Sequence, residues 1–502
     1  MPLPLLSLII FLPLLGALVL LALRGGGEAT QRAARRIALW TSVITWALSV
    51  LLWLGFQPTR PGFQFAERAD WMPGFGVSYH VGVDGISLLF VLLTTTLTPL
   101  AILGSWRLAG ARTRDYMLTV LLLETTLAGL FSSLDLVLFY VFFEATLIPG
   151  SLLIGIWGGE KRIAASLRFF IFTFAGSLFM LISILAMWRI AGTTDIPVLL
   201  HGHFGTATQI WMFVGFLIAF GVKLPAFPLH GWMPDAYAQA PAPAAVLLSG
   251  VLAKAGAYGF LRFNIQLLPD AAHAAAPWMI ALGIIAISYA AITALGQTDM
   301  KRLIAYSSFS HMGLILVGLF TLNGPGVSGA LFQMLSHGIV IAGLFLVAGM
   351  LATRTGSPEI ARFGGVADRM PALATLAMLF TMANIGLPGT GSFVGELLVM
   401  IGAIRVGFWV ALLSGASMIF GAVYMLVLYR RVMFGTASGL VAALRDLTST
   451  ELAVLAPLAF ITLWMGVYPS SFTRIFDPAV RGLTQSGPQA AGLPTGLRVA
   501  AR

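Results

Sequence analysis

Cysteine is absent from this 502-residue chain, and charged residues make up only 10% of it. Without thiolates, the chain cannot bind an iron–sulfur cluster through cysteine. The sequence also lacks a P-loop and a Gly-x-Gly-x-x-Gly pattern after a strand, so no nucleotide site is visible. We therefore expect no cofactor in this chain, and we expect any redox chemistry to take place in partner proteins.

Apolar residues dominate the composition, at 58% of the chain and a mean hydropathy of +0.93. A chain of this composition cannot cover itself with a water-soluble surface. The net charge of +10 is compatible with nucleic-acid binding, but the basic residues stand in ones to threes between apolar runs, as membrane topology signals do. We therefore predict a protein embedded in lipid, with no nucleic-acid partner.

Fourteen apolar runs reach roughly 20 residues, the length of a helix that crosses a bilayer. They lie near residues 3–23, 35–55, 83–106, 115–131, 135–156, 166–189, 209–235, 241–263, 276–295, 303–321, 328–351, 371–403, 407–433 and 452–469. These runs are longer and more uniformly apolar than barrel strands, which alternate over about 10 residues. The predicted fold class is therefore an all-α polytopic membrane protein, and the first run is expected to be a retained span rather than a signal peptide.

Lysine and arginine are distributed unevenly between the loops, which predicts the orientation in the membrane. One side holds most of them, namely Arg24, Arg32, Arg35, Arg36, Arg107, Arg112, Arg114, Lys161, Arg162, Arg168, Lys301, Arg302, Arg354, Arg362, Arg369, Arg430, Arg431 and Arg445. The other side holds Arg60, Arg68, Arg189, Arg262, Arg405, Arg474, Arg481, Arg498 and Arg502. We expect the first side to be cytoplasmic and both termini to be periplasmic, in a bacterial inner membrane.

Seven ionisable residues fall inside the predicted spans. An ionisable group in hydrocarbon costs at least about 2.5–3.5 kcal/mol, so it normally faces a protein interior or water and has a partner. A structural ion pair is a common explanation for one such residue. Seven groups of different kinds on seven spans instead favour a chain that exchanges protons. They are Glu124, Glu144, Lys223, Lys254, His311, His337 and Glu396.

The seventh span is expected to be discontinuous, because prolines interrupt the segment FGVKLPAFPLHGWMPDAYAQAPAP. Pro225 and Pro228 have no N–H group to donate. Without these two donors, the carbonyls of Gly221 and Leu224, four residues earlier, are expected to be unpaired beside Lys223.

The twelfth span contains a second break, in the segment TMANIGLPGTGSFVGE. Pro388 removes a hydrogen bond to Asn384, and nearby glycines lower the helix propensity just before Glu396. A single proline often marks only a packing kink. Interrupted helices at matching places in two halves point to an ion path, and the charge next to each break favours that interpretation.

The remaining polar residues suggest local roles. A glutamate such as Glu144 can act as a switch if its proton affinity depends on where a lysine points. His311 and His337 could relay protons between Lys254 and Glu396, or simply form hydrogen bonds across helices.

Three further groups lie at the ends of spans. Asp84 is predicted to cap the third span. His230 and Asp235 are expected to cap the loop after the first break, or to form a packing cluster there. His201 and His203 provide too few ligands for a metal site, and none is expected.

Six segments are similar to the antiporter-like membrane subunits of respiratory complex I and of the related cation/proton antiporters. They are GVDGISLLF, FYVFFEATLIPG, KLPAFPLHGWMPDAYAQAP, LSGVLAKAGAYG, DMKRLIAYSSFSHMG and GLPGTGSFVGE. The L and N types of this subunit carry lysine on the second broken helix, where this chain has Glu396. Little sequence follows the last span, whereas the L type continues into a long lateral helix. The chain therefore most resembles the M type and its mitochondrial counterpart, chain 4.

This resemblance implies two inverted five-helix repeats, formed by spans 4–8 and 9–13. The expected divisions are residues 1–110, 111–265, 266–435 and 436–502. By resemblance, Glu144 and Lys223 form a coupling pair, Lys254 is the central proton carrier, and Glu396 is the terminal group toward the periplasm. Glu124 occurs in only part of the family, so its role stays open.

The resemblance also implies partners and a source of energy. L- and N-type subunits and small membrane subunits would be partners, and other subunits would hold FMN, iron–sulfur clusters and quinone. Quinone reduction there would drive proton movement here. One rival is an antiporter subunit without a redox partner, which neighbouring dehydrogenase genes would exclude. Another is a structural scaffold in a hydrogenase-type complex, which would gain nothing from buried lysines.

Overall fold

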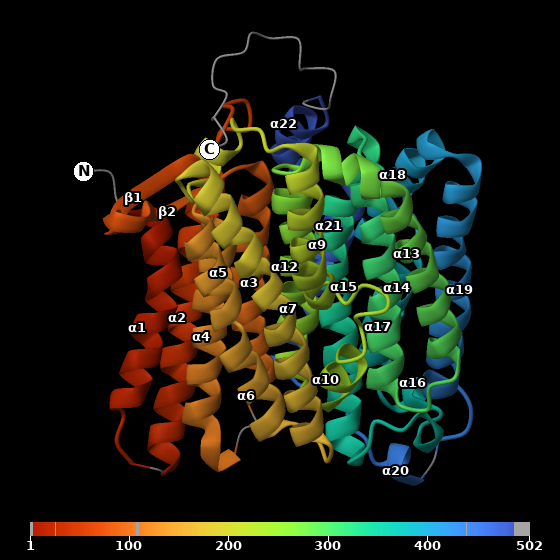
Figure 1. Cartoon of the computed structure of the whole chain (residues 1–502). Coiled ribbons are helices and arrows are strands. Elements are labelled where there is room, and N and C mark those ends of the chain that lie inside the picture. The colour runs from red at the N-terminus through yellow and green to blue at the C-terminus, as the bar shows by residue number, and fades with distance from the viewer. Residues whose placement is uncertain (1–3, 26, 107–109, 438, 486–502) are drawn as a thin grey trace.

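The computed structural model describes residues 4–485 except 26, 107–109 and 438, and it consists almost entirely of upright helices packed side by side (Figure 1). Arg107, Arg498 and Arg502, which contributed to the charge pattern, lie outside the described residues, as does the end of the division 436–502. We call the end of the molecule that carries β1, β2 and α22 the upper face, and the end that carries α16 and α20 the lower face (Figure 1).

The helices of the first part are α1 (Leu5–Ala22), α2 (Glu28–Gly55), α3 (Gly85–Gly104), α4 (Thr113–Ser132), α5 (Leu136–Ala145), α6 (Leu147–Trp157), α7 (Arg162–Ala191), α8 (Ile196–Leu199), α9 (Thr206–Lys223), α10 (Met233–Gln239), α11 (Ala242–Leu247) and α12 (Ala253–Gly259). The second part contains α13 (Pro269–Leu295), α14 (Met300–Phe320), α15 (Gly324–Thr355), α16 (Val366–Arg369), α17 (Pro371–Ile385), α18 (Gly391–Val406), α19 (Phe408–Met433), α20 (Gly439–Ala442), α21 (Ser449–Val467) and α22 (Ser470–Gln485).

Within the described residues, 13 helical stretches are long and apolar enough to cross a membrane. The predicted run 371–403 is not among them, because the chain breaks between α17 and α18. The all-α polytopic prediction is therefore confirmed, together with the discontinuity of the seventh and twelfth spans.

Burial divides the helices into a core and a lipid-facing shell. Span 8 (Ala242–Ile265) is buried along its whole length, α14 is buried except at Arg302, and α15 is nearly as buried. Helices of the shell expose large apolar side chains, such as Trp409 and Ile419 of α19. In a bilayer such side chains face lipid at no cost, whereas buried polar groups must find partners within the protein.

Two helical irregularities were not predicted. The fifth span is interrupted at Thr146, between α5 and α6, where Pro149 cannot donate to the carbonyl of Ala145. Span 8 contains two π-helical turns, η3 (Leu248–Leu252) and η4 (Phe260–Ile265), on either side of α12. Turns of this kind are rare and frequently occur at functional sites.

Outside the spans, the loop that follows α2 forms an antiparallel hairpin of β1 (Gln64–Met72) and β2 (Val77–Val83). Its Glu67 accepts hydrogen bonds from the backbone of Leu6 and Ser7 at the start of α1. Asp135 joins the hairpin to α5, since its carboxylate accepts from the backbone of Ser78 and from the hydroxyl of Thr194. The start of α1 thus lies at the upper face beside the hairpin (Figure 1).

Candidate functional site

Lys254 lies on α12, directly after the π-helical turn η3, and it is completely buried. Its ammonium nitrogen Nζ donates to the carbonyl of Ser249 at 2.5 Å and lies 2.8 Å from Nδ1 of His337. Ser249 belongs to the π turn, where the regular pairing of carbonyls is disturbed. The irregular turn and one histidine therefore supply the polar partners that a buried lysine requires.

His337 of α15 continues the contact toward α14, because its ring lies 5.2 Å from the ring of His311 between centroids. Nδ1 of His311 lies 3.5 Å from a carboxylate oxygen of Glu396 on α18. The amide of Gln333 lies 3.2 Å from His311 and 3.5 Å from Glu396, so it bridges the two. We call this set, Lys254, His337, His311, Gln333 and Glu396, the Lys254 file.

Four polar atoms of the Lys254 file have no hydrogen-bond partner among the described residues: Nε2 of His311, Nε2 of His337, Oε1 of Gln333 and Oε2 of Glu396. The imidazole and carboxylate atoms can accept or release a proton, and all four atoms can accept a hydrogen bond from a water molecule. Oε2 of Glu396 lies against Gly386 at the second break, where an added Cβ would be 2.3 Å away. Gly386 also has φ +87°, so glycine is required there on both grounds.

A second cluster surrounds Lys223, which is buried at the end of α9. Its Nζ donates to the hydroxyl of Thr146 at 2.8 Å and lies 4.7 Å from the ring centre of Phe143. Glu144 precedes Thr146 by two residues and is only partly buried. Its carboxylate lies near Ser177 and senses the charge of Lys223 without forming an ion pair to it. We call Glu144, Thr146 and Lys223 the Lys223 cluster.

The first break is more fully paired than predicted. The carbonyl of Gly221, which we expected to be unpaired, accepts from the N–H of Ala226 at 2.7 Å. This part of the prediction is wrong. The chain forms a turn in which the N–H five residues later replaces the N–H that Pro225 lacks. The carbonyl of Val222 also accepts a hydrogen bond from the indole of Trp232 at 2.9 Å. The backbone of the two residues before Lys223 is therefore held in place.

Asp235 of α10 joins two distant helices at the lower face. Its carboxylate contacts Arg168 of α7 at 2.5 Å and Arg302 of α14 at 2.9 Å. His230 instead packs its ring on Phe309 at 4.3 Å between centroids. Of the two alternatives, Asp235 therefore clamps the segment after the break, and His230 belongs to a packing cluster.

The Lys223 cluster and the Lys254 file approach each other where α9 meets α12. A Cβ added at Gly256 would lie 2.4 Å from the backbone nitrogen of Leu224, so the two helices touch there. No hydrogen bond between described residues links Lys223 directly to Lys254. A proton that passes between them requires movement of a lysine side chain or an inserted water.

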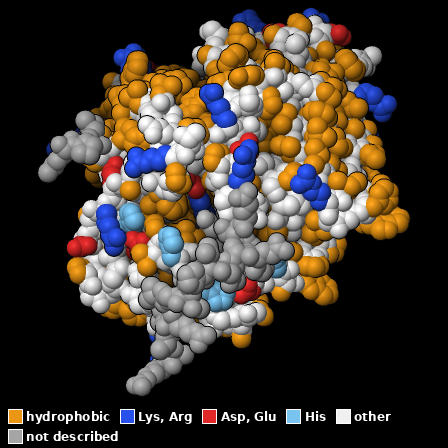
Figure 2. All heavy atoms as spheres, turned by 90° about the horizontal axis from the view of Figure 1, so that it is seen from above, with side chains coloured by type: hydrophobic (Ala, Val, Ile, Leu, Met, Phe, Trp, Pro, Cys, Tyr) orange, Lys and Arg blue, Asp and Glu red, His pale blue; other side chains and the backbone are white. Residues whose placement is uncertain are grey.

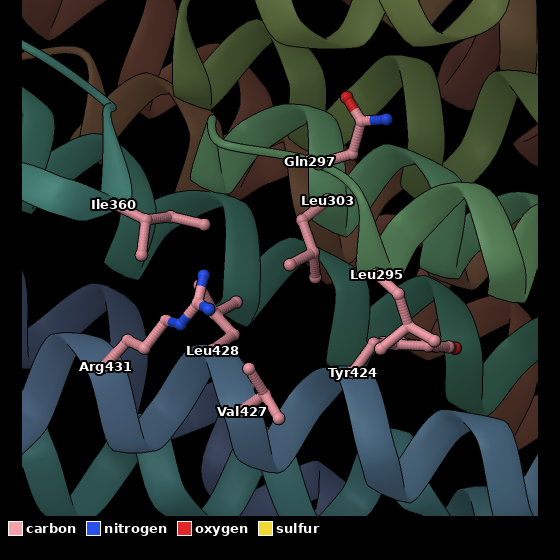
Figure 3. A pocket seen from close by; sticks show the side chains of 8 residues that line it. All are labelled: Leu295, Gln297, Leu303, Ile360, Tyr424, Val427, Leu428 and Arg431. Atoms are coloured by element: carbon pink, nitrogen blue, oxygen red, sulfur yellow. The ribbon is translucent and has the colours of Figure 1, made fainter.

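Another series of polar side chains leads from Asn384, which interacts with His311 of the Lys254 file, toward the lower face. A small cavity of about 10 Å³, near the size limit for one water, is lined by Tyr424 and Leu303, with Gln297 and Arg431 on opposite sides in the view of Figure 3. The Tyr424 hydroxyl donates to Ser307 at 3.3 Å, and Ser307 donates to the side chain of Asn384 at 2.8 Å.

Glu124 stands apart from both groups. It is completely buried on α4, and neither carboxylate oxygen has a partner among the described residues. The structure therefore brings six of the seven predicted residues into two groups and leaves Glu124 outside them.

Comparison with known proteins identifies the family. Residues 133–421 match the family described as NADH:quinone oxidoreductase/Mrp antiporter, TM. The NADH-quinone oxidoreductase subunit M of Rhodobacter capsulatus is 47% identical over 497 residues, with 96% of each chain covered. The chain belongs to this family of antiporter-like membrane subunits.

Two further relatives agree in sequence and in structure. The NADH-ubiquinone oxidoreductase chain 4 of Marchantia polymorpha is 41% identical, with 96% of this chain and 97% of the relative covered. A chain of respiratory complex I from Thermus thermophilus superposes with a TM-score of 0.87 at 35% identity, over 96% of this chain and 99% of that one. The resemblance found in the sequence motifs is thereby confirmed for an antiporter-like subunit of the M type.

Two members of the site were missed from the sequence. Gln333 is four residues before His337 on α15, so both lie on one helix face, and that spacing is a signal that could have revealed it. No such signal exists for Thr146, because its role is to accept a hydrogen bond from Lys223, which is far away in the sequence.

Proposed function

We propose that this antiporter-like subunit moves protons across the bacterial inner membrane as the M-type subunit of an NADH:quinone oxidoreductase. The observation that carries the proposal is the Lys254 file, a series of neighbouring buried groups, most of which can exchange protons, that ends at a broken helix. A membrane scaffold has no use for such a series, because every member is costly to bury.

The roles follow from the contacts. When Lys223 approaches Glu144, the carboxylate offsets its positive charge, and a proton that Lys254 takes up from water meets less repulsion. Lys254 then gives its proton to Nδ1 of His337. His311 receives the proton next and passes it to the carboxylate of Glu396, and each imidazole returns to its neutral form.

The overall assignment has three further parts. Residues 111–265 and 266–435 form the two inverted repeats, between 1–110 and 436–502. The upper face is periplasmic, since the loops at the lower face carry the basic clusters. L- and N-type subunits and small membrane subunits are the partners, and quinone reduction in other subunits supplies the energy.

Lys254 provides the test. In the purified complex reconstituted into vesicles, Lys254→Ala should lower the number of protons moved per NADH, and Lys254→Arg should do nearly the same. Arginine keeps its charge and cannot release a proton, whereas a buried lysine can.

Lys161→Ala is the control, because Lys161 is exposed in a lower-face loop. Normal pumping in both Lys254 variants would reject the proton-carrier role. Failure of NADH dehydrogenase subunits to co-purify with the wild-type chain would instead support an antiporter without a redox partner.

A further inference from the structure

The upper face is hollowed by a cavity of about 780 Å³ that the proposed path to Glu396 does not use. The cavity lies between the loop after α2, the start of α3, the end of span 8 and α22. Its polar lining includes Asp84, Arg262, Gln266, His80, His201 and His273. Histidine side chains gather around a hollow on this face (Figure 2). A cavity of this size and polarity has room for several water molecules.

The base of the cavity is closed by an ion pair. Asp84 caps α3, as predicted, and its carboxylate also accepts a hydrogen bond from Arg262 of η4. Burial alone would raise the pKa of Asp84, but the guanidinium and the bonds from Ser87 outweigh burial and lower the pKa. In the charge pattern of the sequence, Arg262 counts only as a charge on this side of the membrane. Its side chain is in fact buried, and its guanidinium carbon lies 5.2 Å from the ring centre of Tyr258 and 5.6 Å from that of Phe63.

Tyr258 connects this ion pair with Lys254. It lies four residues after Lys254 on α12, one helical turn nearer the cavity. Its buried hydroxyl donates to the carbonyl of Phe131 at 3.3 Å and interacts with Asp84 and Arg262. Three consecutive turns of span 8 therefore present Lys254, Tyr258 and Arg262, the last of them in the wall of the cavity.

We propose that Tyr258, Asp84 and Arg262 form a second proton outlet, which runs from Lys254 to the upper-face cavity in parallel with the route through Glu396. This inference rests on the proposed function, because Lys254 must carry the proton. The ion pair acts as the gate: while Arg262 neutralises Asp84, the carboxylate holds no proton, and the path is closed.

The transfer is balanced at each step. The Tyr258 oxygen accepts a proton from the side of Lys254, directly or through one water, and releases its own hydroxyl proton to the carboxylate of Asp84. Lys254 becomes neutral, and Tyr258 is unchanged. Protonated Asp84 loses its attraction to Arg262 and gives the proton to water in the cavity, after which the ion pair forms again.

The test combines substitutions at the two outlets in the reconstituted complex. Tyr258→Phe keeps the ring and removes the hydroxyl, so it should partly lower the number of protons per NADH. In the Glu396→Gln background, it should remove the pumping that remains. The matched control is Tyr429→Phe, since Tyr429 is also buried and donates to a carbonyl, that of Ala374, in a different part of the molecule.

The outcomes separate the two proposals. If Tyr258→Phe pumps like Tyr429→Phe in both backgrounds, the second outlet does not exist. If Lys254→Ala itself pumps normally, the proposed function fails first.

A double variant tests the gate separately. Asp84→Asn or Arg262→Gln alone leaves a buried charge unpaired and can prevent folding. Asp84→Asn combined with Arg262→Gln removes both charges and keeps side chains that can still form hydrogen bonds. The double variant should assemble and still show the loss seen in Tyr258→Phe. Full pumping in the assembled double variant would show that the pair only fastens helix ends, and would overturn the proposal.

Discussion

The Lys223 cluster and the Lys254 file contain similar chemical groups but are built differently. In the file, each ionisable group lies next to another across two or more helices, and all of them are buried. In the cluster, Lys223 is held by a neutral hydroxyl, and Glu144 is partly exposed and lies apart from it. The groups of the file are thus already in contact with one another, whereas Lys223 and Glu144 of the cluster are not paired.

This difference indicates a division of labour. An ion pair that is not yet formed can respond to a signal, because its formation changes the charge that Lys254 senses. The groups of the file are already in contact, so they do not need to move together in this way, and they can serve as the path for protons. We therefore propose that the cluster is the switch of this subunit and that the file is its proton conductor.

The largest expected effect comes from removing either charged member of the switch. Lys223→Ala and Glu144→Ala should each abolish the share of proton pumping that this subunit contributes, while the complex still assembles. Neither group alone can form the pair that moves charge toward Lys254. Protons per NADH, measured in reconstituted vesicles, report the effect.

Glu160→Gln serves as the control, since Glu160 is exposed in the loop after α6. Normal pumping in both alanine variants would remove the distinction between switch and conductor.

A smaller effect is expected at Thr146. Thr146→Val preserves the shape of the side chain and deletes the acceptor of the Lys223 ammonium, which costs about 1.5–3 kcal/mol for a hydrogen bond to a charged group. The unpartnered ammonium should shift toward Glu144, so pumping should slow without being lost.

The same change at Thr462 is a matched control, because that buried hydroxyl donates only to its own helix, at Leu458. If the Thr146 and Thr462 variants pump equally fast, the resting arrangement of Lys223 does not depend on Thr146.

Hydropathy and proline positions were sufficient to predict the spans and both broken helices, because lipid imposes one length and one pattern on every crossing segment. The pairing at the first break was predicted incorrectly. The rule that proline leaves a carbonyl free holds only for a straight helix, and here the chain bends until Ala226 reaches Gly221.

The candidate residues could be recognised individually, because a charge in a span is costly wherever it points. Their grouping could not. Thr146 matters only through Lys223 of another helix, and the contacts of Gln333 with His311 and Glu396 cross to two other helices. From the sequence, Arg262 counts only as a charge, because the π turn that carries it leaves no mark on the apolar pattern. Contacts between helices depend on packing, which hydropathy does not encode.

Glu396 gives the most direct measurement of the central claim that the Lys254 file conducts protons to a terminal carboxylate. Glu396→Gln keeps the shape and the contact with Gln333 but cannot carry a proton, so protons per NADH should fall strongly in vesicles that hold the assembled complex. Glu396→Lys should be milder, because lysine can also take and release a proton next to the break at Gly386. Full pumping in the glutamine variant, at normal assembly, would contradict the account.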